Sequence, residues 1–211
     1  MADPMPELID KSYFVELANA QPNTLCRKGR CSYLADTHQY SLYIWGDRYL
    51  VDISAAKIDH PLASGPLPHE YFDLFAIYYL LRVADLPLRG EWVSEKDLPG
   101  GPTFFRGPHR IPTDLISKRF DNDLQKFKDR CENLGGRPIE MADAAFRFSI
   151  TPDIPVAVLY WLGDEDFPAE AGILYDRSIS ELLSLDIVFA LAVGVCSRIA
   201  TEAEIGEGRG K

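Results

Sequence analysis

The stretch YSLYIWGDRYLVDI, residues 40–53, carries the clearest fold signal in this sequence. Two runs rich in aromatic and β-branched residues, Tyr40–Trp45 and Arg48–Ile53, flank the pair Gly46-Asp47. Such a pair suits the tight two-residue turn of a β-hairpin. A third strand over Cys31–Ala35 can precede it, so the sequence predicts an N-terminal antiparallel meander.

A second meander is expected near the C-terminus. Its strand candidates are Ala145–Thr151, Val156–Leu162 and Ala171–Asp176. Short turns, TPDIP and GDEDFPAE, separate them, which indicates antiparallel neighbours. We expect these strands and the N-terminal hairpin to share one sheet.

Helical periodicity predicts two buried helices, over residues 69–84 and 186–199. Shorter helices are expected over 13–20, ended by Pro22, and over 122–134, ended by Gly135-Gly136. Meanders followed by helices, without alternating strand–helix–strand units, favour the α+β class: an antiparallel sheet built from two meanders with helices packed on it. We expect a single α+β domain over residues 1–200 and a flexible C-terminal tail over residues 201–211.

Composition restricts the possible partners and location. The chain has 211 residues and a formal net charge of −10. A field of that sign repels phosphate backbones and anionic lipids, so we expect binding to neither nucleic acid nor membranes. The N-terminus lacks the features of a signal peptide, and the most apolar run, Ile187 to Cys196, is too short to cross a bilayer. A soluble, cytoplasmic protein is expected.

The cysteines offer a weak metal candidate. Cys26 and Cys31, in CRKGRC, could ligate zinc or an iron–sulfur cluster. A closed site needs further ligands, so we expect no metal here and interpret the segment as a basic loop that leads into a strand. Cys131 and Cys196 lie on apolar helix faces and are expected to be buried and unligated.

No standard catalytic motif is present: the chain has no GxSxG, GxxxxGK[ST], GxGxxG or HExxH. The acidic loop GDEDFPAE contains Asp164, Glu165, Asp166 and Glu170, which could bind a cation or act in acid–base chemistry. A solvated turn is the alternative, because loops are polar by default. Whether the protein is an enzyme, and which cofactor it uses, stay open.

The segment from Arg89 to Asp114 is rich in glycine, proline, aromatic and basic residues. Its arginines precede an expected helix start, a common anion-binding arrangement, and long irregular segments inside compact domains are often functional. We therefore expect a ligand pocket with Arg106 and Arg110 facing an anionic group. The candidate ligand-binding residues are Trp92, Gly100, Gly101, Phe104, Arg106, His109 and Arg110. The alternative is that the segment only bridges two halves of the fold.

Three segments carry a family resemblance: residues 80–105, residues 115–178 and the hairpin over residues 40–53. They contain the motifs GEWVSEKDLPGG and WLGDEDFPA. Over roughly residues 30–200 the chain closely resembles the uncharacterised DUF3786 family, which is found mainly in anaerobic bacteria and archaea. Some relatives carry an extra cysteine-rich iron–sulfur module at the N-terminus, whereas this chain has only Cys26 and Cys31 there.

The resemblance implies anaerobic redox or cofactor metabolism as the setting. The leading hypothesis is a ligand-binding or accessory protein in that metabolism. A second is an enzyme that acts on an anionic small molecule. Arg106, His109 and Arg110 would bind this molecule, and a carboxylate of GDEDFPAE would act as the base. A third is an interaction module that docks a redox or iron–sulfur partner protein. A large pocket would favour the first two, and a flat exposed apolar face the third.

Overall fold

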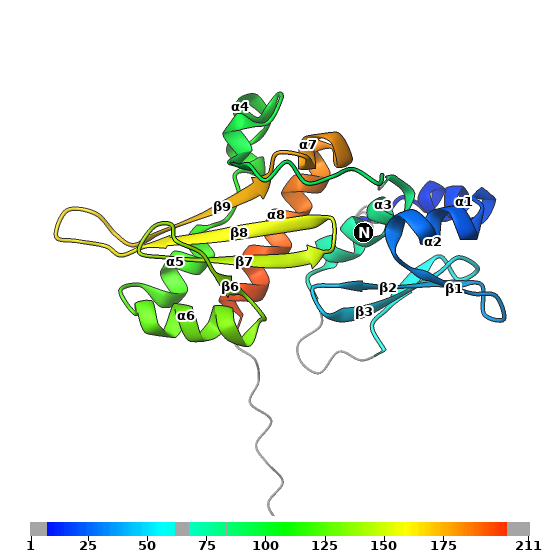
Figure 1. The fold of residues 1–211 in the computed structure, drawn as a ribbon, viewed down its shortest axis with the longest axis horizontal. Coiled ribbons are helices and arrows are strands. Elements are labelled where there is room, and N and C mark those ends of the chain that lie inside the picture. Colours follow the sequence, from blue (N-terminus) through cyan, green and yellow to red (C-terminus); the bar gives the residue numbers. More distant parts are fainter. Residues whose placement is uncertain (1–7, 62–67, 83, 202–211) are drawn as a thin grey trace, which may run out of the picture.

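The computed structural model describes residues 8–61, 68–82 and 84–201, which form helices and two antiparallel sheets (Figure 1). The helices are α1 (Lys11–Asn19), α2 (Pro22–Gly29), α3 (Glu70–Arg82), α4 (Gly101–Phe104), α5 (Asp114–Phe120), α6 (Leu124–Asn133), α7 (Ile179–Leu182) and α8 (Leu185–Ala200), with short 3₁₀ turns η1 (Glu95–Asp97) and η2 (Gly107–His109). The strands are β1 (Ser32–Leu34), β2 (Gln39–Ile44), β3 (Asp47–Asp52), β4 (Lys57–Asp59), β5 (Trp92–Val93), β6 (Arg137–Pro138), β7 (Ala144–Thr151), β8 (Ile154–Trp161) and β9 (Glu170–Asp176).

The α+β class and both meanders are confirmed, but the expectation of one continuous sheet is wrong. One sheet has the order β1-β2-β3-β4 and the other β5-β9-β8-β7-β6. Their corners meet where the backbone N–H of Trp45 donates to the carbonyl of Ile150 over 2.7 Å. The β7–β8 register shifts between Ser149 and Thr151, so Ile150 has no partner in that ladder. This irregularity leaves the Ile150 carbonyl free for the other sheet.

The first hairpin turns one residue earlier than its composition suggests. Ile44 pairs with Asp47, so the loop is Trp45-Gly46 and not Gly46-Asp47. Both loop residues have positive φ, 47° and 83°, as the type I′ turn of a two-residue hairpin requires. A bulky residue in this left-handed region is strained, so Trp45 must be held there by contacts elsewhere in the fold.

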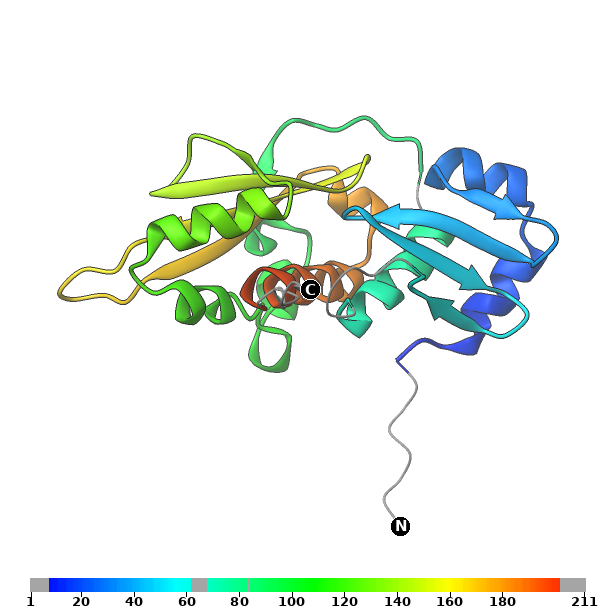
Figure 2. The same cartoon turned by 90° about the horizontal axis from the view of Figure 1, so that it is seen from below.

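Two long apolar helices join the halves of the molecule. The helices expected over residues 69–84 and 186–199 are confirmed as α3 and α8. They pack closely where a Cβ on Gly194 would lie 2.9 Å from the ring of Phe72. Helices α5, α6 and α8 lie on one side of the five-stranded sheet (Figure 2).

The interpretation of CRKGRC as a loop is wrong, because most of it belongs to α2. Pro22 does not simply end α1: it is the first residue of α2, a position where its missing N–H has no consequence. Helix α1 ends at Asn19, in agreement with the expected short helix.

The main hydrophobic cluster contains buried residues from both sheets, among them Tyr40, Val51, Phe148 and Val156. The single-domain assignment over residues 1–200 stays a prediction. The expected tail, residues 201–211, lies outside the described residues apart from Thr201. Among the described residues, no helix has the length and apolar character needed to span a membrane.

Candidate functional site

The segment that begins at Arg89 is attached to the edge of the five-stranded sheet. The buried carboxylate of Asp176 accepts hydrogen bonds from the backbone N–H of Arg89 (2.9 Å) and of Gly90 (2.7 Å), and two more from Ser178. The Arg89 guanidinium binds Glu181, and that of Arg177 binds Glu91. The first part of the segment therefore has a clear structural role.

The glycines of this segment permit a close backbone approach. Gly100 has a φ of 80°, and a Cβ on Gly101 would lie 1.9 Å from the Glu95 carbonyl oxygen. No side chain fits at residue 101, so this glycine is required by the turn itself.

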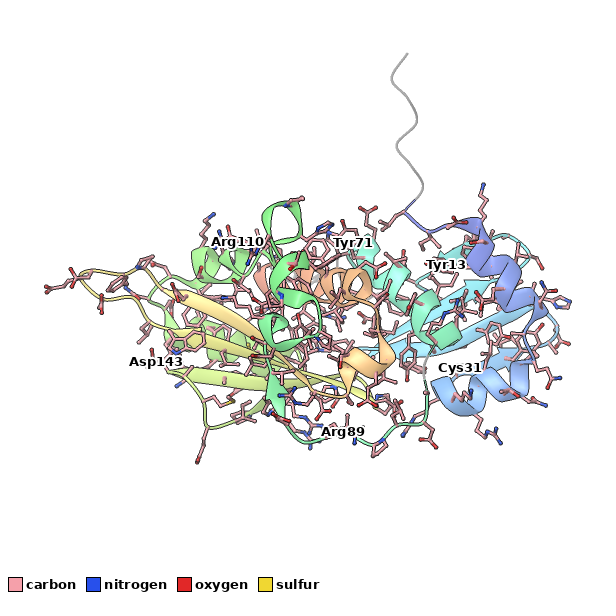
Figure 3. The ribbon with its side chains drawn as sticks, turned by 90° about the horizontal axis from the view of Figure 1, so that it is seen from above. Tyr13, Cys31, Tyr71, Arg89, Arg110 and Asp143 are labelled. Atoms are coloured by element: carbon pink, nitrogen blue, oxygen red, sulfur yellow. The ribbon has the colours of Figure 1, made fainter. Side chains whose placement is uncertain are left out.

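The structure brings together only some of the predicted ligand-binding residues. The Phe104 ring stacks on His109 at 4.5 Å, and His109 meets Phe189 of α8. Trp92 instead packs in a separate small cluster around Ala145, Ala157 and Leu159. Arg106 and Arg110 are exposed, and Figure 3 shows Arg110 near α5. The ligand pocket over residues 92–110 stays a prediction.

The acidic loop joins β8 to β9. One Asp164 oxygen, Oδ1, accepts the backbone N–H groups of Asp166 and Phe167, both at 2.9 Å. Glu165 and Asp166 are exposed. No cluster of three or more potential metal ligands occurs within the part of the chain that the structure describes. The Asp164 carboxylate stabilises its own turn.

Cys131 and Cys196 are fully buried, as predicted. Burial raises the pKa of both thiols far above the ordinary value. Cys26 and Cys31 are partly buried and adjacent, with their sulfurs 2.9 Å apart.

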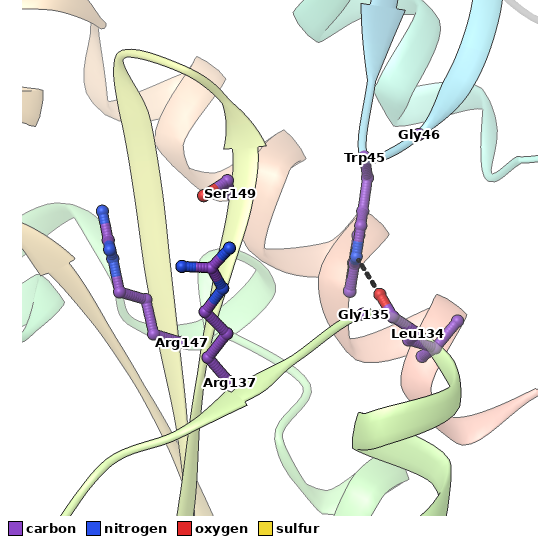
Figure 4. Close-up of a pocket in the computed structure, with 7 residues that line it drawn as sticks. All are labelled: Trp45, Gly46, Leu134, Gly135, Arg137, Arg147 and Ser149. Carbon is purple, nitrogen blue, oxygen red and sulfur yellow. Dashed lines mark hydrogen bonds between the residues drawn. The ribbon is translucent and has the colours of Figure 1, made fainter.

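A cavity of about 280 Å³ opens between the two sheets, beside the end of α6 (Figure 4). Helix α6 ends at Asn133, and Gly135-Gly136 terminates it as predicted: the N–H of Gly136 donates to the Cys131 carbonyl and that of Gly135 to the Glu132 carbonyl, each over 2.8 Å. This is the Schellman arrangement, with Gly135 in the left-handed conformation at a φ of 76°. It turns the chain into β6 and orients the Leu134 carbonyl toward the first sheet.

Trp45 forms the wall of the cavity on the side of the first sheet. Its indole Nε1–H donates to the Leu134 carbonyl over 3.0 Å. The ring also lies 4.8 Å from that of Phe148, and the Arg198 guanidinium lies 4.8 Å from its centroid. These contacts hold the strained residue in place, so the wall is rigid.

Two arginines form the opposite wall. Arg137 of β6 and Arg147 of β7 are direct cross-strand partners and therefore project on the same face. Figure 4 shows the two side chains side by side, with Trp45 across the cavity and Ser149 above them. Among the described residues, neither guanidinium has an ion pair or a hydrogen bond. Like charges in directly opposed positions destabilise a sheet, so this pair requires an explanation.

The chemistry of the cavity suits binding better than catalysis. Of the residues that the structure describes, those lining the cavity supply two cations, the Ser149 hydroxyl and an aromatic ring, but no carboxylate, histidine or cysteine. The acidic loop is remote: Ser149 pairs near the β7–β8 turn, whereas the loop follows the other end of β8. The sequence analysis did not identify Arg137 or Arg147. The alternation in AFRFSI, which places Arg147 and Ser149 on one face, was the available signal.

A second polar cluster lies beneath the first sheet. Nε2 of His60 is 2.9 Å from Oδ1 of Asp73, and the His60 ring centroid is 4.5 Å from that of Tyr49. The Tyr49 hydroxyl and His60 Nδ1 are buried without partners in the described structure. Burial raises the pKa of Asp73 to about 6, although nearby His60 opposes the shift.

Comparison with curated proteins and with solved structures gave no match in either set. One family model matches residues 21–198, from just before α2 into the last turn of α8, and thus includes every residue that lines the cavity. The chain therefore belongs to the family described as a domain of unknown function (DUF3786).

Proposed function

We propose that the protein binds a small anionic molecule in the cavity beside Trp45. The observation that carries the proposal is the cross-strand arginine pair, Arg137 and Arg147, without an acidic partner in the described structure. The chain has 32 acidic and only 22 basic residues, so an uncompensated pair of cations is unexpected. An anion between the two guanidiniums would replace their repulsion with charge-assisted hydrogen bonds.

The size and lining of the cavity indicate the ligand class. A volume of about 280 Å³ is at the lower end for small-molecule sites. A phosphate or carboxylate group fits the arginines and the Ser149 hydroxyl, and a flat apolar part fits the rigid Trp45 wall. An anionic cofactor or metabolite would agree with the redox or cofactor setting that the family resemblance implies.

Thermal unfolding in sodium phosphate, compared with sodium chloride of equal ionic strength, tests the proposal. Phosphate should stabilise the wild-type protein. Arg137→Met and Arg147→Met should each weaken phosphate binding about ten- to hundredfold, because a hydrogen bond to a charged group contributes about 1.5–3 kcal/mol. Without phosphate, Arg147→Met should be slightly more stable than the wild type, because the repulsion is gone.

Arg110→Met is the matched control, since Arg110 is an exposed arginine outside the cavity. It should respond to phosphate like the wild type. If Arg110→Met lost the response while both cavity variants kept it, the anion site would lie in the segment over residues 92–110 instead. That result would contradict the proposal.

A further inference from the structure

Cys26 and Cys31 form a pair of thiols at the end of α2 and are not among the residues that line the cavity. Their sulfurs are 2.9 Å apart, about 0.9 Å longer than a disulfide bond of roughly 2.05 Å. Their backbones are adjacent too, because the Cys31 N–H donates to the Cys26 carbonyl over 3.2 Å. Figure 3 places Cys31 beside α2, at the opposite end of the molecule from Asp143.

The proximity is produced by the local chain path. Helix α2 ends at Gly29, and the C-cap residue Arg30 adopts the left-handed conformation with a φ of 48°. This turn folds the following residue back onto the last helical turn, where Cys26 lies. The turn at Arg30 therefore brings the two thiols together.

The donor count fits a dithiol better than a metal site. A closed zinc site has four ligands. Among the described residues, no group of three or more histidine, cysteine or acidic side chains could hold a metal ion. Two sulfurs this close need only a small side-chain rotation to form a covalent bond.

The surroundings favour attack by Cys26 on an anionic reagent. Arg27 and Lys28 are exposed in the last turn of α2, so an anionic reagent that approaches Cys26 is attracted by two positive charges. The Tyr40 hydroxyl is buried without a partner in the described structure. Its pKa is raised to about 12, mainly by burial and to a smaller extent by the nearby thiols of Cys26 and Cys31. Burial also raises the pKa of Cys31, which disfavours Cys31 as the thiol that attacks first.

We propose that Cys26 and Cys31 are a redox-active pair that exchanges with a small anionic disulfide. The Cys26 thiolate attacks one sulfur of the reagent, the reagent's S–S bond breaks, and one thiolate leaves. Cys31 then attacks Cys26 in the mixed disulfide and releases the second thiolate. The two protein thiols are oxidised to one disulfide, the reagent is reduced to two thiols, and the two protons pass to these thiols. This inference does not rest on the anion cavity.

Oxidised glutathione, an anionic disulfide, is the probe. The reduced full-length protein is incubated with it without oxygen, quenched with an alkylating agent and mapped by peptide mass spectrometry. The wild type and the Cys131→Ser, Cys196→Ser double variant should both yield a Cys26–Cys31 linked peptide. Cys31→Ser should instead accumulate a glutathione adduct on Cys26. A wild type alkylated at both cysteines under oxidising conditions, or linked mainly through Cys131 or Cys196, would overturn the proposal.

Charge reversal tests the preference for an anionic reagent. Arg27→Glu combined with Lys28→Glu should slow the reaction with oxidised glutathione about tenfold, because electrostatic attraction becomes repulsion. The rate with an uncharged disulfide, hydroxyethyl disulfide, should stay nearly unchanged. Equal slowing with both reagents would show that the basic residues do not select the anion.

Discussion

Replacing Trp45 with phenylalanine should destabilise the protein by about 1.5–4 kcal/mol. The change keeps an aromatic ring but removes the indole N–H, so the Leu134 carbonyl loses its donor. An unsatisfied polar group in a protein interior costs about 1–3 kcal/mol. The smaller ring also weakens the contact with the Arg198 guanidinium, worth about 0.5–1 kcal/mol. With a urea m-value of about 2 kcal/mol/M, the unfolding midpoint should fall by about 1–2 M.

Trp161→Phe is the matched control, because Trp161 is 40% exposed at the end of β8. It should change stability by less than about 0.5 kcal/mol. Far-UV circular dichroism is the appropriate assay, since both substitutions alter tryptophan fluorescence. Equal midpoints for the two variants would refute the argument that Trp45 joins the sheets.

Three further predictions concern stability. Gly136→Ala should lower the free energy of unfolding by about 2–3 kcal/mol, because the new Cβ would lie 2.7 Å from the Phe148 ring and 2.8 Å from the Cys131 carbonyl. An unchanged thermal unfolding midpoint would contradict this. Asp176→Asn should cost about 2–3 kcal/mol at neutral pH. Burial raises the pKa of Asp176, but the hydrogen bonds to its carboxylate lower this pKa by more. The contribution of the ionised carboxylate to stability should therefore be lost as pH falls below about 4. A difference in stability between variant and wild type that does not change with pH would count against this. For Asp73, burial raises the pKa to about 6, so wild-type stability should fall as pH rises from about 4 to 6. Asp73→Asn should remove this loss of stability. If urea titrations between about pH 4 and 6 showed the same pH dependence of stability for both proteins, the prediction would be wrong.

The sequence predicted the strands well where burial alternates or is continuous. The second meander lies within two residues of its expected bounds, because runs such as FRFSI and VAVLYW leave little ambiguity. The end of α6 was equally clear, because Gly135-Gly136 permits a turn that other residues resist. The separation into two sheets could not be predicted, since it depends on how the strands meet in space.

The errors have a common physical cause. Gly46-Asp47 has the better composition for a tight turn, but distant partners, the carbonyls of Leu134 and Ile150, place Trp45 in the loop instead. Helix α2 was missed because Pro22 can equally end one helix or begin the next. In both cases contacts or context beyond the local sequence decide the outcome.

The arginine pair was missed for a related reason. Arg137 and Arg147 are ten positions apart in the sequence, and Arg137 lies in a strand of only two residues. Local composition pointed instead to Arg106 and Arg110, which are close together in the sequence. Proximity across a ladder becomes visible only once the register is known.

The contact between Trp45 and Leu134 joins residues 89 positions apart. By contrast, β7, β8 and β9 pair with their immediate neighbours along the chain. Closing a long loop is entropically unfavourable until its contacts form, so each meander should assemble before the junction between them. Contacts made after the folding barrier affect mainly the unfolding rate. The junction at Trp45 would then determine the kinetic stability of the protein: it slows unfolding of the native state and has little effect on the folding rate.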